Sequence, residues 1–168
     1  TLQNSTLQSE WVHTLYTHTH PTYTGRVTLP LLWDQKAGRL LSNDSTELLW
    51  WLLESWPQLT PFPSQLSIKP ISSEAERAEI QGALQWITSK VTNGPYRAIF
   101  STHQALYEEN VIAFFEALDV VEERLQRQPF FMGESLSACD LTLFPTLYRL
   151  ELAYRTHLKC ALKRLSDY

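Results

Sequence analysis

The stretch TLPLLWDQKAGRLLSNDSTELLWWLL, residues Thr28 to Leu53, decides the fold because it combines a proline, a tight turn and a capped apolar run. It predicts a strand over Thr28–Trp33, a turn over Asp34–Gly38 and a return strand over Arg39–Ser42. Pro30 lacks a backbone N–H, so within a strand it fits only an edge, a bulge or the end of the hydrogen-bond ladder. We therefore expect a gap in backbone hydrogen bonding beside Pro30.

A helix is predicted to begin directly after this hairpin. Asp44 and Glu47 have the spacing of a capping box, in which the first side chain accepts a hydrogen bond from the N–H three residues later. The buried side of the helix is then expected to be Leu48, Leu49, Trp51, Leu52 and Leu53. Taken alone, a sequence of this kind predicts a plain helix cap for Asp44 and Ser45.

Composition and charge exclude several functional classes. Hydrophobic residues make up 43% and charged residues 19% of the 168, which is typical of a globular protein. The formal net charge of −4 offers no basic face for a phosphate backbone, so nucleic acid is not an expected partner. The apolar runs fall far short of the ~20 residues that cross a bilayer, so we expect no membrane span.

Cysteine and histidine usage gives two further expectations. Cys139 and Cys160 are too few for a disulfide framework, which favours a reducing, cytoplasmic location. Both are expected to be packing residues rather than nucleophiles. His13, His18 and His20 have no carboxylate or cysteine at ligand spacing, so no metal site is predicted.

The remainder of the chain predicts a linker followed only by helices. Residues 57–70, PQLTPFPSQLSIKP, hold four of the nine prolines and predict a non-helical linker between domains at 1–56 and 71–168. Apolar residues spaced three or four apart predict two helices, at Ile80–Val91 and Tyr107–Leu125. The fold class is therefore α+β, a hairpin and helix followed by an all-α bundle.

Another helix start is predicted in LSACDLTLF, residues 136–144. Ser137 and Asp140 have the spacing of a reciprocal cap. The helix is predicted to run through Tyr154 despite Pro145, which should bend its axis. A last short helix is expected over Leu158–Leu165.

This order of elements resembles the glutathione transferases. YTGRVTLPLLWDQKAGRLLSNDSTELL is similar to a segment of the glutathionyl-hydroquinone reductases, the Xi class of that superfamily. NGPYRAIFSTHQALYEENVIAFFEALDVVEERL, LSACDLTLFPTLYRLELAY and THLKCALKRLSDY match the same family in the same order, so the resemblance covers nearly everything from Tyr23 to Tyr168. It implies a glutathione transferase-like fold, in which 1–56 is part of a thioredoxin-like, glutathione-binding domain and 71–168 is the helical domain.

The resemblance implies a glutathione site in the first domain. The proline at Pro30 is cis in such families, and the backbone of Leu29 would pair with the cysteinyl part of glutathione as an added strand. Asp44 and Ser45 stand where the family has Glu-Ser and would hold the γ-glutamyl end, since a helix N-terminus favours a carboxylate. The alternatives are that Pro30 only ends an edge strand and that Asp44 only caps a helix. Trp50 departs from the family, which usually has Arg there.

The resemblance implies a second set of contacts in the helical domain. Tyr96 and Tyr154 fall where the family places phenol hydroxyls that bond the quinone oxygen, although isolated tyrosines of this kind are usually core residues. The implied co-substrate is glutathione and the implied partner a quinone-type conjugate, with no metal. The resemblance also implies a homodimer.

The family's nucleophile is a cysteine in a Cys-Pro-Trp sequence, which this chain lacks, so its place is expected upstream of Thr1. Two functional classes remain open. One is a thiol transferase that removes glutathione from glutathionyl-hydroquinones, with this chain alone inactive. The other is a noncatalytic glutathione transferase-like module for binding or dimerisation. A Cys-Pro-Trp segment upstream favours the first, and a true start at Thr1 favours the second.

Overall fold

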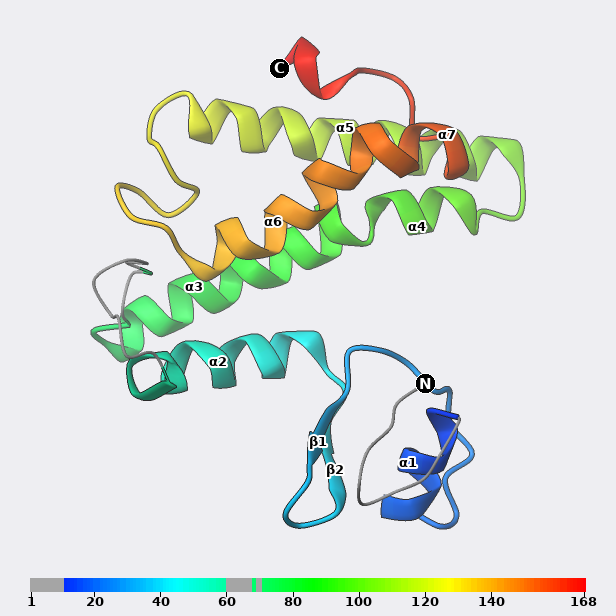
Figure 1. The fold of residues 1–168 in the computed structure, drawn as a ribbon. Helices are drawn as coiled ribbons and strands as arrows, with labels where there is room; N and C mark the ends of the chain where they lie inside the picture. Colours follow the sequence, from blue (N-terminus) through cyan, green and yellow to red (C-terminus); the bar gives the residue numbers. More distant parts are fainter. Residues whose placement is uncertain (1–10, 60–67, 69–70) are drawn as a thin grey trace. The chain divides into compact units, whose positions relative to one another are not determined.

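The computed structural model describes residues 11–59, 68 and 71–168, with the backbone alone for 56–59. The chain forms two compact units, Thr1–Pro61 and Phe62–Tyr168 (Figure 1). Most of the predicted linker, residues 60–67 and 69–70, lies outside the described residues.

The first unit is a β-hairpin between two helices. Its elements are α1 (His13–Thr19), β1 (Leu32–Asp34), β2 (Arg39–Ser42) and α2 (Ser45–Leu59). The strands are antiparallel, with a register shift that marks a bulge between Leu32 and Trp33. At the turn, Asp34 Oδ1 accepts hydrogen bonds from the N–H groups of Lys36 and Ala37, both at 2.9 Å. Gly38 follows at a φ of 63°, a conformation that favours glycine.

Two boundaries in this unit differ from the prediction. The first strand begins at Leu32 rather than Thr28, because the backbone of Thr28 is bonded to a side chain of α1 and Pro30 cannot donate to a ladder. The helix α2 extends to Leu59 and includes Pro57, where a linker was predicted. A proline so near a helix end removes a single hydrogen bond, and the helix stops two residues later.

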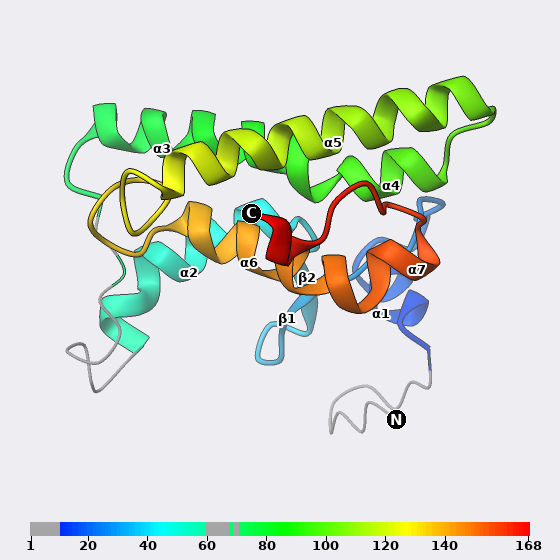
Figure 2. The same ribbon diagram turned by 90° about the horizontal axis from the view of Figure 1, so that it is seen from above.

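The second unit is helical (Figure 2). Its α-helices are α3 (Glu74–Ile87), α4 (Gly94–Ile99), α5 (Gln104–Leu125), α6 (Ala138–Arg149) and α7 (Arg155–His157). Two wider π-type turns, η1 (Thr88–Thr92) and η2 (Leu150–Tyr154), extend α3 and α6, and a 3₁₀ turn, η3 (Leu165–Asp167), lies near the end. The helix α4 packs along α5, and α3 packs against α6.

The core of this unit confirms the predicted apolar periodicity. Ile80, Leu84, Ile87 and Val91 are all buried on one side of α3 and η1. On α5 the buried stripe includes Phe114, which has no exposed surface. These contacts, and not intrinsic propensity, supply most of the stability of such helices.

The predicted helix start at Ser137 is also confirmed. Asp140 Oδ2 accepts hydrogen bonds from the Ser137 N–H at 2.9 Å and the Ser137 hydroxyl at 2.6 Å. The second oxygen, Oδ1, accepts from the Phe131 N–H at 2.7 Å. A single carboxylate therefore fixes both the start of α6 and the loop that precedes it.

The predicted last helix over Leu158–Leu165 is wrong. Lys159 has a φ of 59°, in the left-handed region, which an α-helix cannot continue through. The N–H groups of Leu158 and Cys160 both donate to the Tyr154 carbonyl, each at 3.1 Å, so the chain turns back here.

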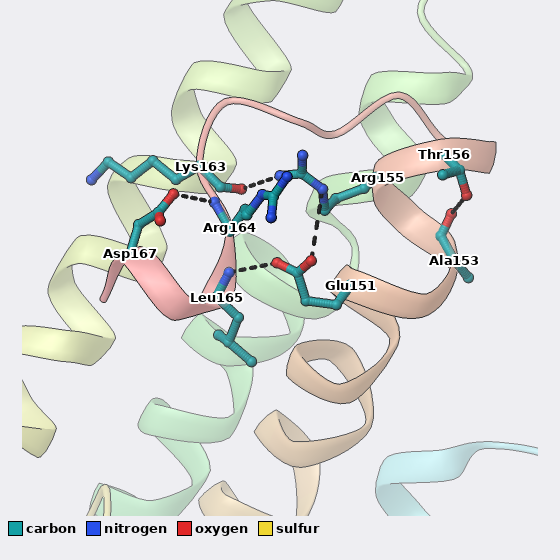
Figure 3. Close-up of polar contacts among 8 residues, drawn as sticks. All are labelled: Glu151, Ala153, Arg155, Thr156, Lys163, Arg164, Leu165 and Asp167. Atoms are coloured by element: carbon teal, nitrogen blue, oxygen red, sulfur yellow. Dashed lines mark hydrogen bonds and ion pairs between the residues drawn. The ribbon is translucent and has the colours of Figure 1, made fainter.

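Two side chains that flank Tyr154 hold the returning segment in its place (Figure 3). Glu151 accepts a hydrogen bond from the Leu165 N–H at 2.6 Å. Arg155 donates to the Lys163 carbonyl at 2.9 Å and forms an ion pair with Glu151 at 3.7 Å. The segment is therefore fixed by side chains rather than by a helix of its own.

Candidate functional site

The backbone at Leu29 is unpaired among the described residues. The Leu29–Pro30 peptide bond is cis, as the family resemblance implies. The Leu29 side chain is 73% exposed, and neither its N–H nor its carbonyl makes a hydrogen bond within the described part of the chain. An extended ligand has access to both backbone groups.

Thr28, the residue before Leu29, is held from two sides. The buried Tyr16 on α1 donates its hydroxyl to the Thr28 carbonyl at 2.7 Å and accepts from the Thr28 N–H at 3.3 Å. Asn43 Nδ2 donates to Thr28 Oγ1 at 2.8 Å. The helix α1 is in turn attached to β2, because Thr19 Oγ1 accepts from the Leu40 N–H at 2.8 Å.

The sequence analysis did not identify Tyr16 or Asn43. The opening of the chain reads as polar and rich in threonine, with apolar residues only at scattered positions. No spacing rule connects Tyr16 with Thr28, which lies 12 positions further on. The one local signal was the adjacent pair Leu15 and Tyr16, which are both buried.

The N-terminus of α2 is capped by Asp44, as predicted. Its Oδ1 accepts from the N–H groups of Thr46 at 2.9 Å and Glu47 at 2.8 Å. The reciprocal half of the capping box passes through a third residue: the Ser42 hydroxyl donates to the Glu47 carboxylate and accepts from the Asp44 N–H at 3.1 Å. The cap is thus complete without Ser45.

Ser45 is the first residue of α2 and is exposed. Its hydroxyl and its N–H have no hydrogen-bond partner among the residues that the structure describes. A helix N-terminus carries positive potential and free N–H groups, so this position can receive a carboxylate. Asp44 Oδ2 is likewise without a partner there and can accept from an ammonium group.

One hydrogen bond links the unpaired backbone at Leu29 to the start of α2. The bond from Asn43 to Thr28 joins the residue before Asp44 to the residue before Leu29. The structure therefore gathers Leu29, Pro30, Asp44 and Ser45 in one region of the first unit.

Tyr96 and Tyr154 form a pair in the second unit. Their hydroxyl oxygens lie 3.1 Å apart, and their rings meet edge to face with centroids 5.7 Å apart. Tyr154, at the end of η2, is buried, whereas Tyr96 on α4 is 39% exposed. Burial raises the pKa of Tyr154, and its hydrogen bond with Tyr96 raises that pKa further. The pair therefore presents a protonated hydroxyl donor, which suits a phenolate or carbonyl oxygen.

The two thiols are buried and unsuited to act as nucleophiles. Cys139 and Cys160 are free and have no exposed surface. Burial raises the pKa of each thiol to about 11, and the Asp140 carboxylate adds to the rise at Cys139, so neither is a thiolate near neutral pH. Within the described ranges, no group of three or more His, Cys, Asp or Glu side chains is placed to hold a metal ion. Nor does any helix there have the length and apolar content of a membrane span.

Residues 104–168 match the family model of the glutathione S-transferase C-terminal domain. The chain is 35% identical to the glutathionyl-hydroquinone reductase PcpF of Sphingobium chlorophenolicum, over 95% of this chain and 50% of that protein. It is 36% identical to the glutathionyl-hydroquinone reductase YqjG of Escherichia coli K12, over 96% of this chain and 48% of that protein. The chain thus spans about half the length of these curated relatives.

Solved structures of similar proteins also match nearly the whole of this chain and about half of their own length. The glutathione-bound structure of YqjG matches with a TM-score of 0.86, over 98% of this chain and 52% of that chain, at 34% identity. The glutathione transferase Xi of Phanerochaete chrysosporium also matches with a TM-score of 0.86, over 98% of this chain and 54% of that chain, at 34% identity.

Proposed function

Since this chain is a homologue of the glutathionyl-hydroquinone reductases and Xi-class glutathione transferases and has a glutathione transferase-like fold, we propose that it is part of an enzyme that uses glutathione to remove glutathione from glutathionyl-hydroquinones. The observation that carries the proposal is the hydrogen bond from Asn43 to Thr28. It links the residue before the unpaired backbone of Leu29 to the residue two before Ser45, whose N–H and hydroxyl have no partner among the described residues.

Glutathione would bind in two parts. Its cysteinyl backbone would pair with the N–H and carbonyl of Leu29, as an added strand. Its γ-glutamyl carboxylate would accept from the hydroxyl and the N–H of Ser45 at the start of α2, and its ammonium group would donate to Asp44. Both ends of the site have polar groups that no other described residue occupies.

The reaction needs a thiolate, for which we propose a cysteine upstream of Thr1. That thiolate would attack the glutathione sulfur of the conjugate, so the bond between sulfur and the aromatic carbon breaks and the carbon takes a proton. The hydroquinone leaves and the enzyme is left as a mixed disulfide. A second glutathione thiolate then releases the enzyme cysteine and forms glutathione disulfide. The phenols of Tyr96 and Tyr154 would hold the quinone oxygen meanwhile.

The experiment compares this chain with a longer protein that includes the upstream coding sequence. Each is mixed with glutathionyl-menadiol and glutathione, and glutathione disulfide and free menadiol are measured. We expect turnover by the longer protein and none by the 168-residue chain. Absence of glutathione disulfide with the longer protein would overturn the proposal, and thiol transfer by the 168-residue chain would mean that the nucleophile is misplaced.

A noncatalytic glutathione transferase-like module for binding or dimerisation is the second candidate, and the burial of both thiols favours it. The turnover assay separates the two, because both candidates can bind glutathione but the noncatalytic module would form no glutathione disulfide. For either function we propose a homodimer in a reducing, cytoplasmic location, which light scattering and cell fractionation would test.

A further inference from the structure

Tyr107, near the start of α5, makes a long-range contact that the proposed site does not use. Its hydroxyl donates to the Lys159 carbonyl at 2.6 Å, across 52 positions in the sequence. The Tyr107 side chain is only partly exposed. The hydrogen bond therefore attaches the segment after η2 to the side of α5.

The residue that Tyr107 holds has an unfavourable backbone conformation. Lys159 is the one residue other than glycine with a positive φ in the described ranges, at 59°. A left-handed conformation is unfavourable for an L-residue, so the surrounding contacts must maintain it. This turn directs the Cys160 N–H to the Tyr154 carbonyl, beside the Leu158 N–H, while the Cys160 side chain is fully buried.

The same end of α5 also holds the segment that carries the other phenol. Asn110, three residues after Tyr107, donates to Ser101 Oγ at 3.0 Å and to the Arg97 carbonyl at 3.4 Å. Arg97 directly follows Tyr96 on α4. Positions three apart share a helix face. One face of α5 thus contacts the supports of both Tyr96 and Tyr154.

We propose that Tyr107 is a positioning residue, which holds the Tyr154 phenol at hydrogen-bonding distance from Tyr96 through the left-handed turn at Lys159. The side chains of Glu151 and Arg155 fix the far end of the same segment (Figure 3). Lys163 also forms an ion pair with Asp119, and the Tyr168 hydroxyl donates to the Phe115 carbonyl, so this far end is attached to α5 as well. Tyr107 supplies the attachment nearer to Tyr154. The positioning of Tyr154 by Tyr107 is argued from these contacts alone. Its importance for binding a quinone substrate rests on the proposed function.

The test uses the 168-residue chain with ¹³C-labelled tyrosine rings, and the Tyr154 signal is assigned from a Tyr154→Phe sample. In Tyr107→Phe we expect the Tyr154 signal to shift and its titration midpoint to fall, because the hydrogen bond with Tyr96 weakens. The matched control is Tyr148→Phe, since the Tyr148 hydroxyl makes no hydrogen bond among the described residues and the side chain is 60% exposed. An unchanged Tyr154 signal in Tyr107→Phe would overturn the inference.

A second variant separates positioning from a general loss of folding. Glycine adopts a positive φ without a steric penalty, so Lys159→Gly in the Tyr107→Phe background should restore most of the Tyr154 titration. If the double variant is as perturbed as Tyr107→Phe, Tyr107 does not act through the turn and the inference fails. If Tyr107→Phe alone folds poorly, the double variant can be measured in its place.

Menadiol binding distinguishes this inference from the proposed function. We expect several-fold weaker menadiol binding in Tyr107→Phe and unchanged binding in Tyr148→Phe. If the Tyr154 signal moves but menadiol affinity does not, the positioning role stands and the quinone role of the phenols fails. If the Tyr154 signal does not move, the positioning role fails whatever the menadiol result.

Discussion

The phenol of Tyr16 bonds to both backbone groups of Thr28, donating to its carbonyl at 2.7 Å and accepting from its N–H at 3.3 Å. In a sheet, a neighbouring strand satisfies such a pair of groups. Here one side chain does so, and the next residue, Leu29, keeps its own N–H and carbonyl unpaired among the described residues. The helix α1 thus determines where the protein's own pairing ends and where a ligand strand can begin.

Tyr16→Phe should therefore loosen the backbone beside Pro30. The variant loses two hydrogen bonds worth about 1 kcal/mol each, so the Thr28 amide should exchange with deuterium roughly 30-fold faster. Glutathione affinity should fall with it, because Leu29 is less well ordered. The control is Tyr23→Phe, which removes a hydroxyl that bonds to the Arg26 carbonyl instead. Equal exchange rates at Thr28 in both variants would contradict the role given to Tyr16.

Asp44→Ala should lower the stability of the chain, whereas Ser45→Ala should lower its glutathione affinity without lowering its stability. Asp44 caps α2, so its loss should cost about 1 kcal/mol of stability. The Ser45 hydroxyl has no partner among the described residues and alanine favours helices, so Ser45→Ala should leave stability unchanged or slightly higher. Its glutathione affinity should nevertheless fall roughly tenfold, through loss of one charge-assisted hydrogen bond. Calorimetric titration and urea unfolding of both variants check this, and unaltered affinity in Ser45→Ala would remove Ser45 from the site.

Tyr96→Phe should lower the pKa of Tyr154. Burial and the hydrogen bond from Tyr96 both raise that pKa, and burial is the larger cause. Without the Tyr96 hydroxyl, Tyr154 should therefore lose its proton at a lower pH than in the wild type, yet still above the ordinary value of 10.0 for tyrosine. Absorbance at alkaline pH, or the ¹³C signal of Tyr154, measures the midpoint. A higher midpoint in the variant would show that the hydroxyl pair does not stabilise the neutral phenol.

The parts of the fold that the sequence predicted well depend on residues close together in the chain. The Gly38 turn, the cap at Asp44 and the start of α6 at Ser137 each involve groups within a few positions of one another. The helices α3 and α5 follow from apolar residues three or four positions apart. Local chemistry determines these features, so local patterns were enough to predict them.

The errors and omissions lie where distant contacts override local preference. Tyr16 meets Thr28 across 12 positions and Tyr107 meets Lys159 across 52, and neither pair has a spacing that sequence rules recognise. The last predicted helix failed because Lys159 is left-handed, which lysine does not signal. The candidate roles of Leu29 and Tyr154 came from the family resemblance and remain predictions.

Stability should fall as the pH rises above about 9. Burial raises the pKa of Cys139 and Cys160 from 9.0 to about 11 in the folded chain, so between these values the unfolded chain has lost protons that the folded chain retains. A raised pKa of this kind contributes stability that is present below pH 9 and lost as the pH rises towards 11, by roughly 2–3 kcal/mol for each thiol. Urea unfolding at pH 8 and pH 10.5 measures the loss. Cys160→Ala should reduce the pH dependence, and an identical pH dependence in that variant would contradict the assignment.

Two glycines provide a matched test of how closely α4 packs against α5. Gly94, the first residue of α4, is buried, and a Cβ there would lie 2.5 Å from Phe114 Cδ2. The Phe114 ring is completely enclosed and cannot move aside, so Gly94→Ala must push α4 away from α5. The expected cost is about 1–3 kcal/mol. Because Tyr96 lies two residues further along α4, its hydrogen bond with Tyr154 should weaken as well.

Gly82, in the middle of α3, is the control for Gly94. A Cβ at Gly82 meets no heavy atom within 4 Å, so alanine should stabilise the helix by roughly 0.5–1 kcal/mol through its higher propensity. The two Gly→Ala variants should therefore shift the urea unfolding midpoint in opposite directions. If Gly94→Ala is as stable as Gly82→Ala, α4 does not approach Phe114 this closely. The packing of α4 against α5, which positions Tyr96 near Tyr154, would then be less close than the contacts of α5 imply.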